Sequence, residues 1–208
     1  MLLPPPNPND KLLTSERLPN TAVVDFWQWA YGDLMEDTVK GVFAEWIVHK
    51  LLGVHSPRRV SWANSDVITP TGVRFEIKST AFWQSWKLRN ERGNIEVKPK
   101  HSTPLDDRKI RFQGLKARDS TSPAFSDPRT FKSHFYIFAF QNERNPSNWN
   151  ALDLAQWEFY LVNVTELERL GWASISLATL RSKFQCLSAP ELSEAGRKAI
   201  ADNVATDA

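Results

Sequence analysis

The sequence predicts an α/β fold in which a mixed β-sheet is flanked by α-helices. Its 208 residues, 41% hydrophobic and 24% charged, suffice for one well-buried domain and exclude collagen-like, low-complexity and disulfide-scaffold proteins. Residues 37–52 carry apolar side chains at helical spacing, whereas residues 73–80 alternate with a period of two. Residues 134–140 are almost continuously apolar, which is typical of a strand buried on both faces.

Two helices are expected near the start of the domain. Residues 1–20 are rich in Pro and Asn and indicate an extended or poorly ordered arm, and residues 22–31 follow as a short aromatic helix. The second helix is expected to begin at Asp37 or Thr38, both good capping residues, and to end before Gly53. The apolar positions expected to face the core are Val39, Val42, Phe43, Trp46, Ile47 and Leu51.

Glu45 lies off this apolar stripe of the second helix. At 100° per residue it points among Gly41, Val48 and Leu52, so its carboxylate has mostly nonpolar neighbours. Burying an unpaired charge is costly, so Glu45 needs a partner. His49, one turn further along, either supports such a site or is a packing residue.

The other elements follow from shorter patterns. Strands are expected at residues 60–63, 66–69, 73–80, 95–97, 110–112, 134–140 and 157–162, and later helices at residues 166–170 and 177–184. Residues 21–188 are expected to form a single domain, and residues 189–208 a polar, peripheral tail that is helical if it is structured.

A hairpin places acidic residues opposite each other. Counting back from a turn at residues 69–72 pairs Asp66 with Glu76. Paired side chains lie about 4.5–5.5 Å apart, so these carboxylates repel each other by about 3 kcal/mol at an effective dielectric of 20. A cation is therefore expected between them: Lys78, on the same face as Glu76, or a Mg²⁺ or Mn²⁺ ion, both of which prefer oxygen ligands.

Asp66, followed after nine residues by Glu76-Ile77-Lys78, resembles the PD-(D/E)xK signature of restriction-endonuclease-like nucleases. The resemblance implies a restriction-endonuclease-like mixed sheet flanked by helices and a Mg²⁺- or Mn²⁺-dependent endonuclease that hydrolyses DNA phosphodiester bonds. It implies that Asp66, Glu76 and the Ile77 carbonyl hold the metal, and that Lys78 orients or deprotonates the attacking water. Helix residues 41–48 resemble the first core helix of the superfamily, which implies that Glu45 completes the metal site.

Two further observations bear on this resemblance. Ser65 stands where the signature usually has Pro, and residues 25–30 resemble a set of small bacterial proteins of the same nuclease-like type. An acid-x-Lys tripeptide alone is weak evidence, because about one is expected by chance in this composition. Two others occur, at residues 96–98 and 107–109, and neither follows a hairpin-paired Asp.

Simpler structural interpretations stay open for these residues. Asp66, Glu76 and Lys78 can instead form an exposed cross-strand ladder of salt bridges, and Glu45 can pair with a Lys or Arg.

The distribution of charge suggests where a nucleic acid would bind. The net charge of +2 is uneven, since residues 87–140 carry 12 Lys and Arg against 6 Asp and Glu. This segment is either a phosphate-facing surface or a solvated loop. The candidate substrate-binding residues are Gln84, Lys98, Lys100, Arg108 and Lys109.

Composition also bounds the compartment and the partners. The single Cys186 and four His residues offer neither a disulfide nor zinc-type spacing, which favours a reducing cytoplasm, and no apolar run is long enough to span a membrane. DNA is the expected partner, with a homodimer or larger assembly for double-strand cuts. The alternatives are a catalytically inactive nuclease-like module that binds DNA or protein, and a Trp-rich subunit of a defence or repair assembly.

Overall fold

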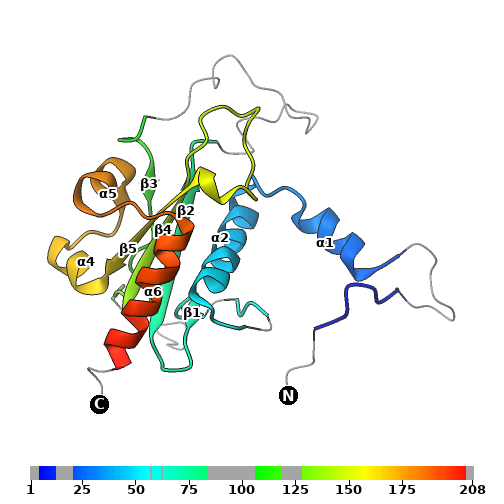
Figure 1. Cartoon of the computed structure of the whole chain (residues 1–208), viewed down its shortest axis with the longest axis horizontal. Helices are drawn as coiled ribbons and strands as arrows, with labels where there is room; N and C mark the ends of the chain where they lie inside the picture. The colour runs from blue at the N-terminus through cyan, green and yellow to red at the C-terminus, as the bar shows by residue number, and fades with distance from the viewer. Residues whose placement is uncertain are drawn as a thin grey trace.

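The computed structural model describes residues 5–12, 21–56, 58–61, 63–83, 106–118 and 128–204. In these residues, five helices accompany a four-stranded mixed sheet of order β1-β2-β4-β5 (Figure 1). The edge strand β1 (Val67–Ile68) is antiparallel to β2 (Arg74–Ala81), which runs parallel to β4 (Phe135–Gln141). The last strand, β5 (Trp157–Asn163), is antiparallel to β4. The expected α/β class with a mixed sheet is confirmed.

Two long helices cover one face of the sheet. Helix α2 (Asp37–Leu52) packs against β2, and α6 (Ala189–Val204) packs against both α2 and β5 (Figure 1). All seven residues of β4 are buried, as its apolar sequence predicts for a strand with neighbours on both sides. The core on this face includes Ala44, Ile47, Val48, Phe75, Ile77, Ile137, Ala139, Phe159 and Leu192.

Smaller elements cover the opposite face. They are the short ribbon of β3 (Arg111–Phe112) with β6 (Ile175–Ser176), and the helices α4 (Val164–Leu170) and α5 (Leu177–Lys183). Their core includes Phe112, Leu115, Tyr136, Phe138, Phe140, Tyr160, Leu167, Leu177 and Leu180. A 3₁₀ turn, Leu154–Gln156, leads into β5.

The first helix stands apart from this body. Helix α1 (Val23–Tyr31) projects away from the sheet and has no buried residue (Figure 1). It forms where the aromatic pattern predicts it, and Gly32 follows its end. None of the helices in the described part of the chain is long and apolar enough to cross a membrane.

The face that α2 turns to the core differs from the expected one. Its buried apolar residues are Ala44, Ile47, Val48 and Leu52, whereas Trp46 is 54% exposed. Of the expected stripe of Val39, Val42, Phe43, Trp46, Ile47 and Leu51, Ile47 is in the core and Phe43 and Leu51 pack against it, whereas Trp46 is misplaced. The helix is apolar nearly all round, so its sequence does not select one face, and contacts with β2 and α6 decide the orientation.

The hairpin forms in the expected register. Val67 pairs with Phe75 and Ile68 with Arg74, which aligns Asp66 with Glu76. Gly72 has φ +83°, a conformation that glycine adopts readily. The expected strand at residues 60–63 is wrong, since residues 60, 61 and 63 belong to no strand. The one expected at residues 95–97 lies outside the described residues.

The C-terminal segment is a core element rather than a peripheral tail. Helix α6 spans 16 residues, and its Leu192 is fully buried against the sheet. Small residues let it lie close to α2: Ala195 and Ala199 pack against the same core. The expected polar character is correct only for the outer side of this helix.

Helix α6 lies close to α2 at Gly196. A Cβ placed on Gly196 would lie 2.1 Å from Cδ2 of the buried Leu52. We expect Gly196→Ala to lower the free energy of unfolding by about 1–3 kcal/mol through overpacking, although alanine gains about 1 kcal/mol in helix propensity. Urea denaturation measures this, with Glu194→Ala on the exposed side of α6 as the control. An alanine variant more stable than the wild type would show that the helices separate freely.

Candidate active site

The candidate site begins where β1 and β2 separate. The backbone N–H of Asp66 donates to the Phe75 carbonyl oxygen at 3.1 Å. The next N–H on this edge of β2, that of Ile77, donates instead to the Asp66 carboxylate, at 2.7 Å from Oδ2. The N–H and C=O of one strand residue point to the same side, so the Ile77 carbonyl faces this edge too. The carboxylate and the carbonyl therefore meet at the sheet edge.

Glu76 and Lys78 project together from one face of β2. Nζ of Lys78 lies 2.5 Å from Oε1 of Glu76, and the two side chains are only 22% and 17% exposed. The expected alternation along the strand is confirmed, since their neighbours Phe75 and Ile77 are buried in the opposite core. Beside Nζ lies Gly114, whose φ is +67° and where a Cβ would be 3.9 Å from that nitrogen.

The charges of Glu76 and Glu45 act on the Asp66 carboxyl. Burial, followed by the negative charges of Glu76 and Glu45, raises the pKa of Asp66 to about 7, against the opposing effects of the Ile77 N–H and the Lys78 charge. A salt-bridge ladder would hold the pKa of an Asp below its ordinary value. The raised pKa favours a site that concentrates negative charge, which is typical of functional centres.

Glu45 has a partner that the sequence did not identify. Arg59 donates from Nε and Nη2 to the two carboxylate oxygens of Glu45, at 2.5 and 2.8 Å. Hydrogen bonding to Glu45 raises the pKa of Arg59. Arg59 is therefore the partner that the Glu45 carboxylate needs because of its burial. The metal-ligand role stays a prediction, and it requires this pair to open.

His49 and Ser65 fix the backbone around Asp66. Nε2 of His49 lies 3.2 Å from the Asp66 carbonyl oxygen, which connects α2 to the hairpin. Ser65 is buried and accepts a hydrogen bond from the Ser133 hydroxyl at 2.8 Å. The serine in the usual proline position therefore ties the start of β1 to the segment before β4.

The donor set suits a hard divalent cation. The described residues contain no group of three or more His, Cys, Asp and Glu side chains arranged to hold a metal. Mg²⁺, however, is commonly bound through one or two carboxylates and completes its shell with water. Asp66, Glu76 and the Ile77 carbonyl supply three oxygens of this kind, so these residues fit Mg²⁺ or Mn²⁺ and are the ones that would hold it.

The expected substrate-binding residues are only partly placed. Gln84, Lys98 and Lys100 lie outside the described residues. Arg108 is 82% exposed and pairs with Asp106 at 2.7 Å, and Lys109 is exposed in the same turn. The substrate-binding role of Arg108 and Lys109 stays a prediction.

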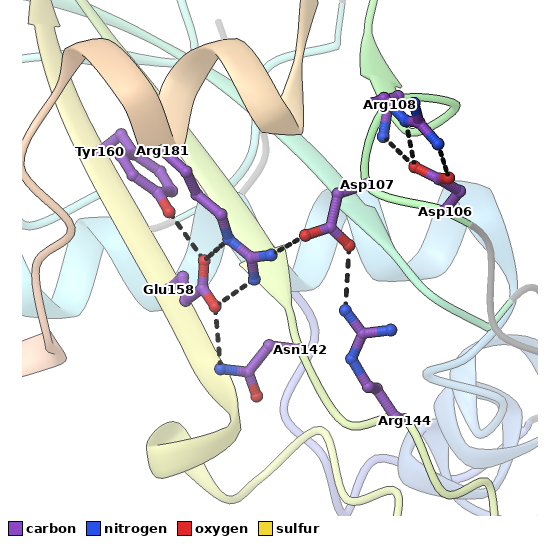
Figure 2. Close-up of polar contacts among 8 residues, drawn as sticks. All are labelled: Asp106, Asp107, Arg108, Asn142, Arg144, Glu158, Tyr160 and Arg181. Carbon is purple, nitrogen blue, oxygen red and sulfur yellow. Dashed lines mark hydrogen bonds and ion pairs between the residues drawn. The ribbon is translucent and has the colours of Figure 1, made fainter.

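The turn is attached to the other end of the sheet by an ion-pair network (Figure 2). Arg181 of α5 donates to both oxygens of Glu158 on β5 and also pairs with Asp107, which Arg144 contacts at 2.9 Å. Burial acts to raise the pKa of Glu158, but the hydrogen bonds from Arg181 and Tyr160 outweigh it and keep that pKa low. Asp107 of the acid-x-Lys tripeptide at residues 107–109 is therefore bound by ion pairs to α5 and to Arg144.

We expect Arg181→Met to destabilise the protein by about 1–3 kcal/mol, because it leaves the partly buried Glu158 without its guanidinium. The loss stays below the 3–5 kcal/mol of a fully buried pair, since Arg181 is 31% exposed. Urea denaturation at pH 7 tests this. Arg108→Ala, at an exposed arginine of the same region, should leave the midpoint unchanged. Equal midpoints for both variants would contradict the structural role of Arg181.

Comparison of the chain with models of protein families, with curated proteins and with solved structures finds no match in any of the three.

Proposed function

We propose that the protein is a metal-dependent nuclease that hydrolyses DNA phosphodiester bonds at the β1–β2 edge. The observation that supports this most strongly is the raised pKa of the Asp66 carboxyl, caused by burial and by the charges of Glu76 and Glu45, together with the Lys78 ammonium that contacts Glu76. A surplus of partly buried negative charge favours binding of a divalent cation. Lys78, which contacts Glu76, supplies the positive charge that phosphate hydrolysis also requires.

Each residue of the site has a distinct part in this proposal. Asp66, Glu76 and the Ile77 carbonyl would hold Mg²⁺ or Mn²⁺, which when bound lowers the pKa of water and offsets the charge of the phosphate. The Lys78 ammonium orients the attacking water and stabilises the negative charge that develops on the phosphate oxygens. His49 acts as a positioning residue, because it holds the Asp66 backbone through the carbonyl contact.

The direct test is a cleavage assay on the purified full-length chain. Plasmid, linear duplex and single-stranded DNA, and RNA, are incubated with Mg²⁺, with Mn²⁺ and with EDTA. We expect DNA cleavage with either ion and none with EDTA. Cleavage that persists in EDTA, or a preparation inactive on every substrate with both ions, would contradict the proposal.

A catalytically inactive nuclease-like module is the second candidate. It is favoured by the existing contacts: Arg59 occupies both oxygens of Glu45, Lys78 pairs with Glu76, and Ile77 contacts Asp66. Such a module would bind DNA or a partner protein without cutting. Its distinguishing property is indifference to Mg²⁺ and Mn²⁺ in both cleavage and thermal stability.

A further inference from the structure

Two short segments outside the main sheet run side by side near the candidate site. Residues 116–118 and 129–131 are joined at Ala117 and Thr130, whose backbone N–H groups donate to each other's carbonyl oxygens at 2.9 and 3.0 Å. We call this pair of segments the basic strip. The pairing is antiparallel, so the register places residue 116 opposite residue 131 and residue 118 opposite residue 129.

Three cationic side chains share one face of the basic strip. Side chains alternate between the two faces of paired segments, so Lys116 and Arg118 lie on the same face as Arg129 and Phe131. The contacts agree with this register. Nζ of Lys116 lies 5.0 Å from the centroid of the Phe131 ring, and both residues line a hollow of about 240 Å³ together with Arg129. The three cations therefore form one patch.

The charges of this patch are not neutralised within the described part of the chain. There, neither the Arg118 nor the Arg129 side chain has an ion pair or a hydrogen bond, and Lys116 contacts a carbonyl oxygen and the Phe131 ring. Glu168 also lines the hollow, but it forms no ion pair with these described cations. Like charges directly opposite each other destabilise paired strands. A bound anion would offset the repulsion between the two arginines.

Tyr136 of β4 attaches the basic strip to the body of the protein beside the candidate site. Its hydroxyl donates to the Leu115 carbonyl oxygen at 3.0 Å and accepts from the Lys132 N–H at 3.2 Å, so it holds both segments of the strip. Gly114 lies beside Nζ of Lys78 and only two residues before the strip. Two residues span at most about 7 Å of chain, so the strip begins close to Lys78.

We propose that the basic strip binds the sugar–phosphate backbone of a nucleic acid, with neighbouring phosphates at Lys116 and at the pair of Arg118 and Arg129. Guanidinium groups bind phosphate oxygens through two parallel hydrogen bonds, and the lysine contributes a point charge. A strand held on the strip continues to Lys78. The inference rests on the proposed function and specifies how the substrate of that site is held.

The strip provides charge rather than a surface for stacking bases. The Phe131 ring packs edge-on against Tyr136, with centroids 5.6 Å apart and an angle of 86° between the planes, and Lys116 lies over it. Contacts to phosphates carry no direct information about base sequence. The strip is therefore expected to bind nucleic acids of different sequence equally well.

The salt dependence of binding tests this inference. Fluorescein-labelled 20-base-pair DNA duplexes of two unrelated sequences are titrated with the full-length chain in EDTA at 50 to 200 mM KCl, and fluorescence anisotropy is recorded. Replacing both arginines, as Arg118→Gln with Arg129→Gln, removes two phosphate contacts. The slope of log affinity against log salt should then become shallower by about 2, and affinity at 0.1 M salt should fall by about 10- to 100-fold. Both duplexes should behave alike.

The matched control removes the same charge from the other side of the sheet. Arg197→Gln with Lys198→Gln replaces two exposed cations of α6, which packs on the face opposite to Tyr136, and should keep the wild-type slope. Thermal melts complete the comparison. Because the double variant of Arg118 and Arg129 loses a like-charge pair, it should melt no lower than the wild type.

Several results would overturn the inference. They are a slope that the Arg118 and Arg129 variant leaves unchanged, an equal loss in the α6 control, a double variant that loses binding but also melts below the wild type, or no binding by the wild type. Binding to phosphatidylserine vesicles that the same variant abolishes, without binding to DNA, would assign the strip to a lipid surface instead. Because EDTA suppresses metal-dependent cleavage, strip-dependent binding by a protein that never cuts overturns only the nuclease proposal, and cutting with strip-independent binding overturns only this one.

Discussion

Replacing Lys78 with methionine is expected to slow DNA cleavage by about 10²- to 10⁴-fold under single-turnover conditions. The Lys78 ammonium is the cation beside Glu76 at the β1–β2 edge, with its Nζ 2.5 Å from the Glu76 carboxylate, and it is only 22% exposed. Partial burial strengthens its effect on a bound phosphate, because less water screens the charge. Methionine keeps a similar length and removes both the charge and the donors.

The control variants separate chemistry from folding. Lys183→Met removes an exposed lysine at the end of α5 and should cut at the wild-type rate. Asp66→Ala and Glu76→Ala should abolish cleavage, whereas Glu45→Ala should reduce it more mildly, since Arg59 donates to both oxygens of that carboxylate. Thermal melts of each variant show whether it is folded. A folded Lys78→Met protein that cuts at the wild-type rate would refute the assignment of the site.

Parts of the structure that depend on local periodicity could be predicted from the sequence. Alternation in β2 places Glu76 and Lys78 on one face, and the turn before it sets the register that aligns Asp66 with Glu76. Both rules involve residues close in sequence, so they required no knowledge of the tertiary contacts. The central strand β4 was equally evident, because only a strand covered on both faces is apolar throughout.

Features that depend on contacts between distant segments could not be predicted. The core side of α2 matches the expected one only in part, because the helix is apolar nearly all round. The expected peripheral position of α6 is wrong, because its apolar stripe is short of large residues: Leu192, Ala195, Ala199 and Ile200 contact the core, and Gly196 lies against Leu52. The sequence does not identify the partner of Glu45 for a similar reason. Arg59 lies 14 residues away in an irregular segment, where no periodic rule places a side chain.

Asp66→Asn is expected to stabilise the metal-free protein at pH 8 by about 1–4 kcal/mol. Burial and the neighbouring carboxylates raise the folded-state pKa of Asp66 to about 7, against 3.8 ordinarily. Between these two values the folded protein holds a proton that the unfolded chain releases, so stability falls as pH rises through this window and levels off above pH 7. A difference of about three pKa units between the folded and unfolded states corresponds to at most about 4 kcal/mol of stability. Asparagine keeps an oxygen that can accept the hydrogen bond from the Ile77 N–H.

Melts in EDTA from pH 5 to 8 measure this effect. The stability difference between Asp66→Asn and the wild type should increase with pH in favour of the variant. Asp106→Asn is the matched control, because the hydrogen bonds of Arg108 hold the pKa of that exposed carboxyl below its ordinary value, and its titration is complete before pH 5. If the stability difference between Asp66→Asn and the wild type also stays constant from pH 5 to 8, the pKa of Asp66 is not raised in the folded state.

Added Mg²⁺ should narrow or reverse the stability difference between the two proteins. At a hundred times its dissociation constant, an ion that binds only the folded state stabilises it by about 2.7 kcal/mol, and this gain should be seen for the wild type but not for Asp66→Asn. The gain should be larger at pH 8 than at pH 6, because at pH 6 the ion must displace a proton from Asp66. A ladder of salt bridges predicts the opposite: the asparagine variant is the less stable one, and Mg²⁺ does not distinguish it from the wild type. A wild type that melts identically with EDTA, Mg²⁺ and Mn²⁺ would therefore leave the inactive nuclease-like module as the function that this site supports.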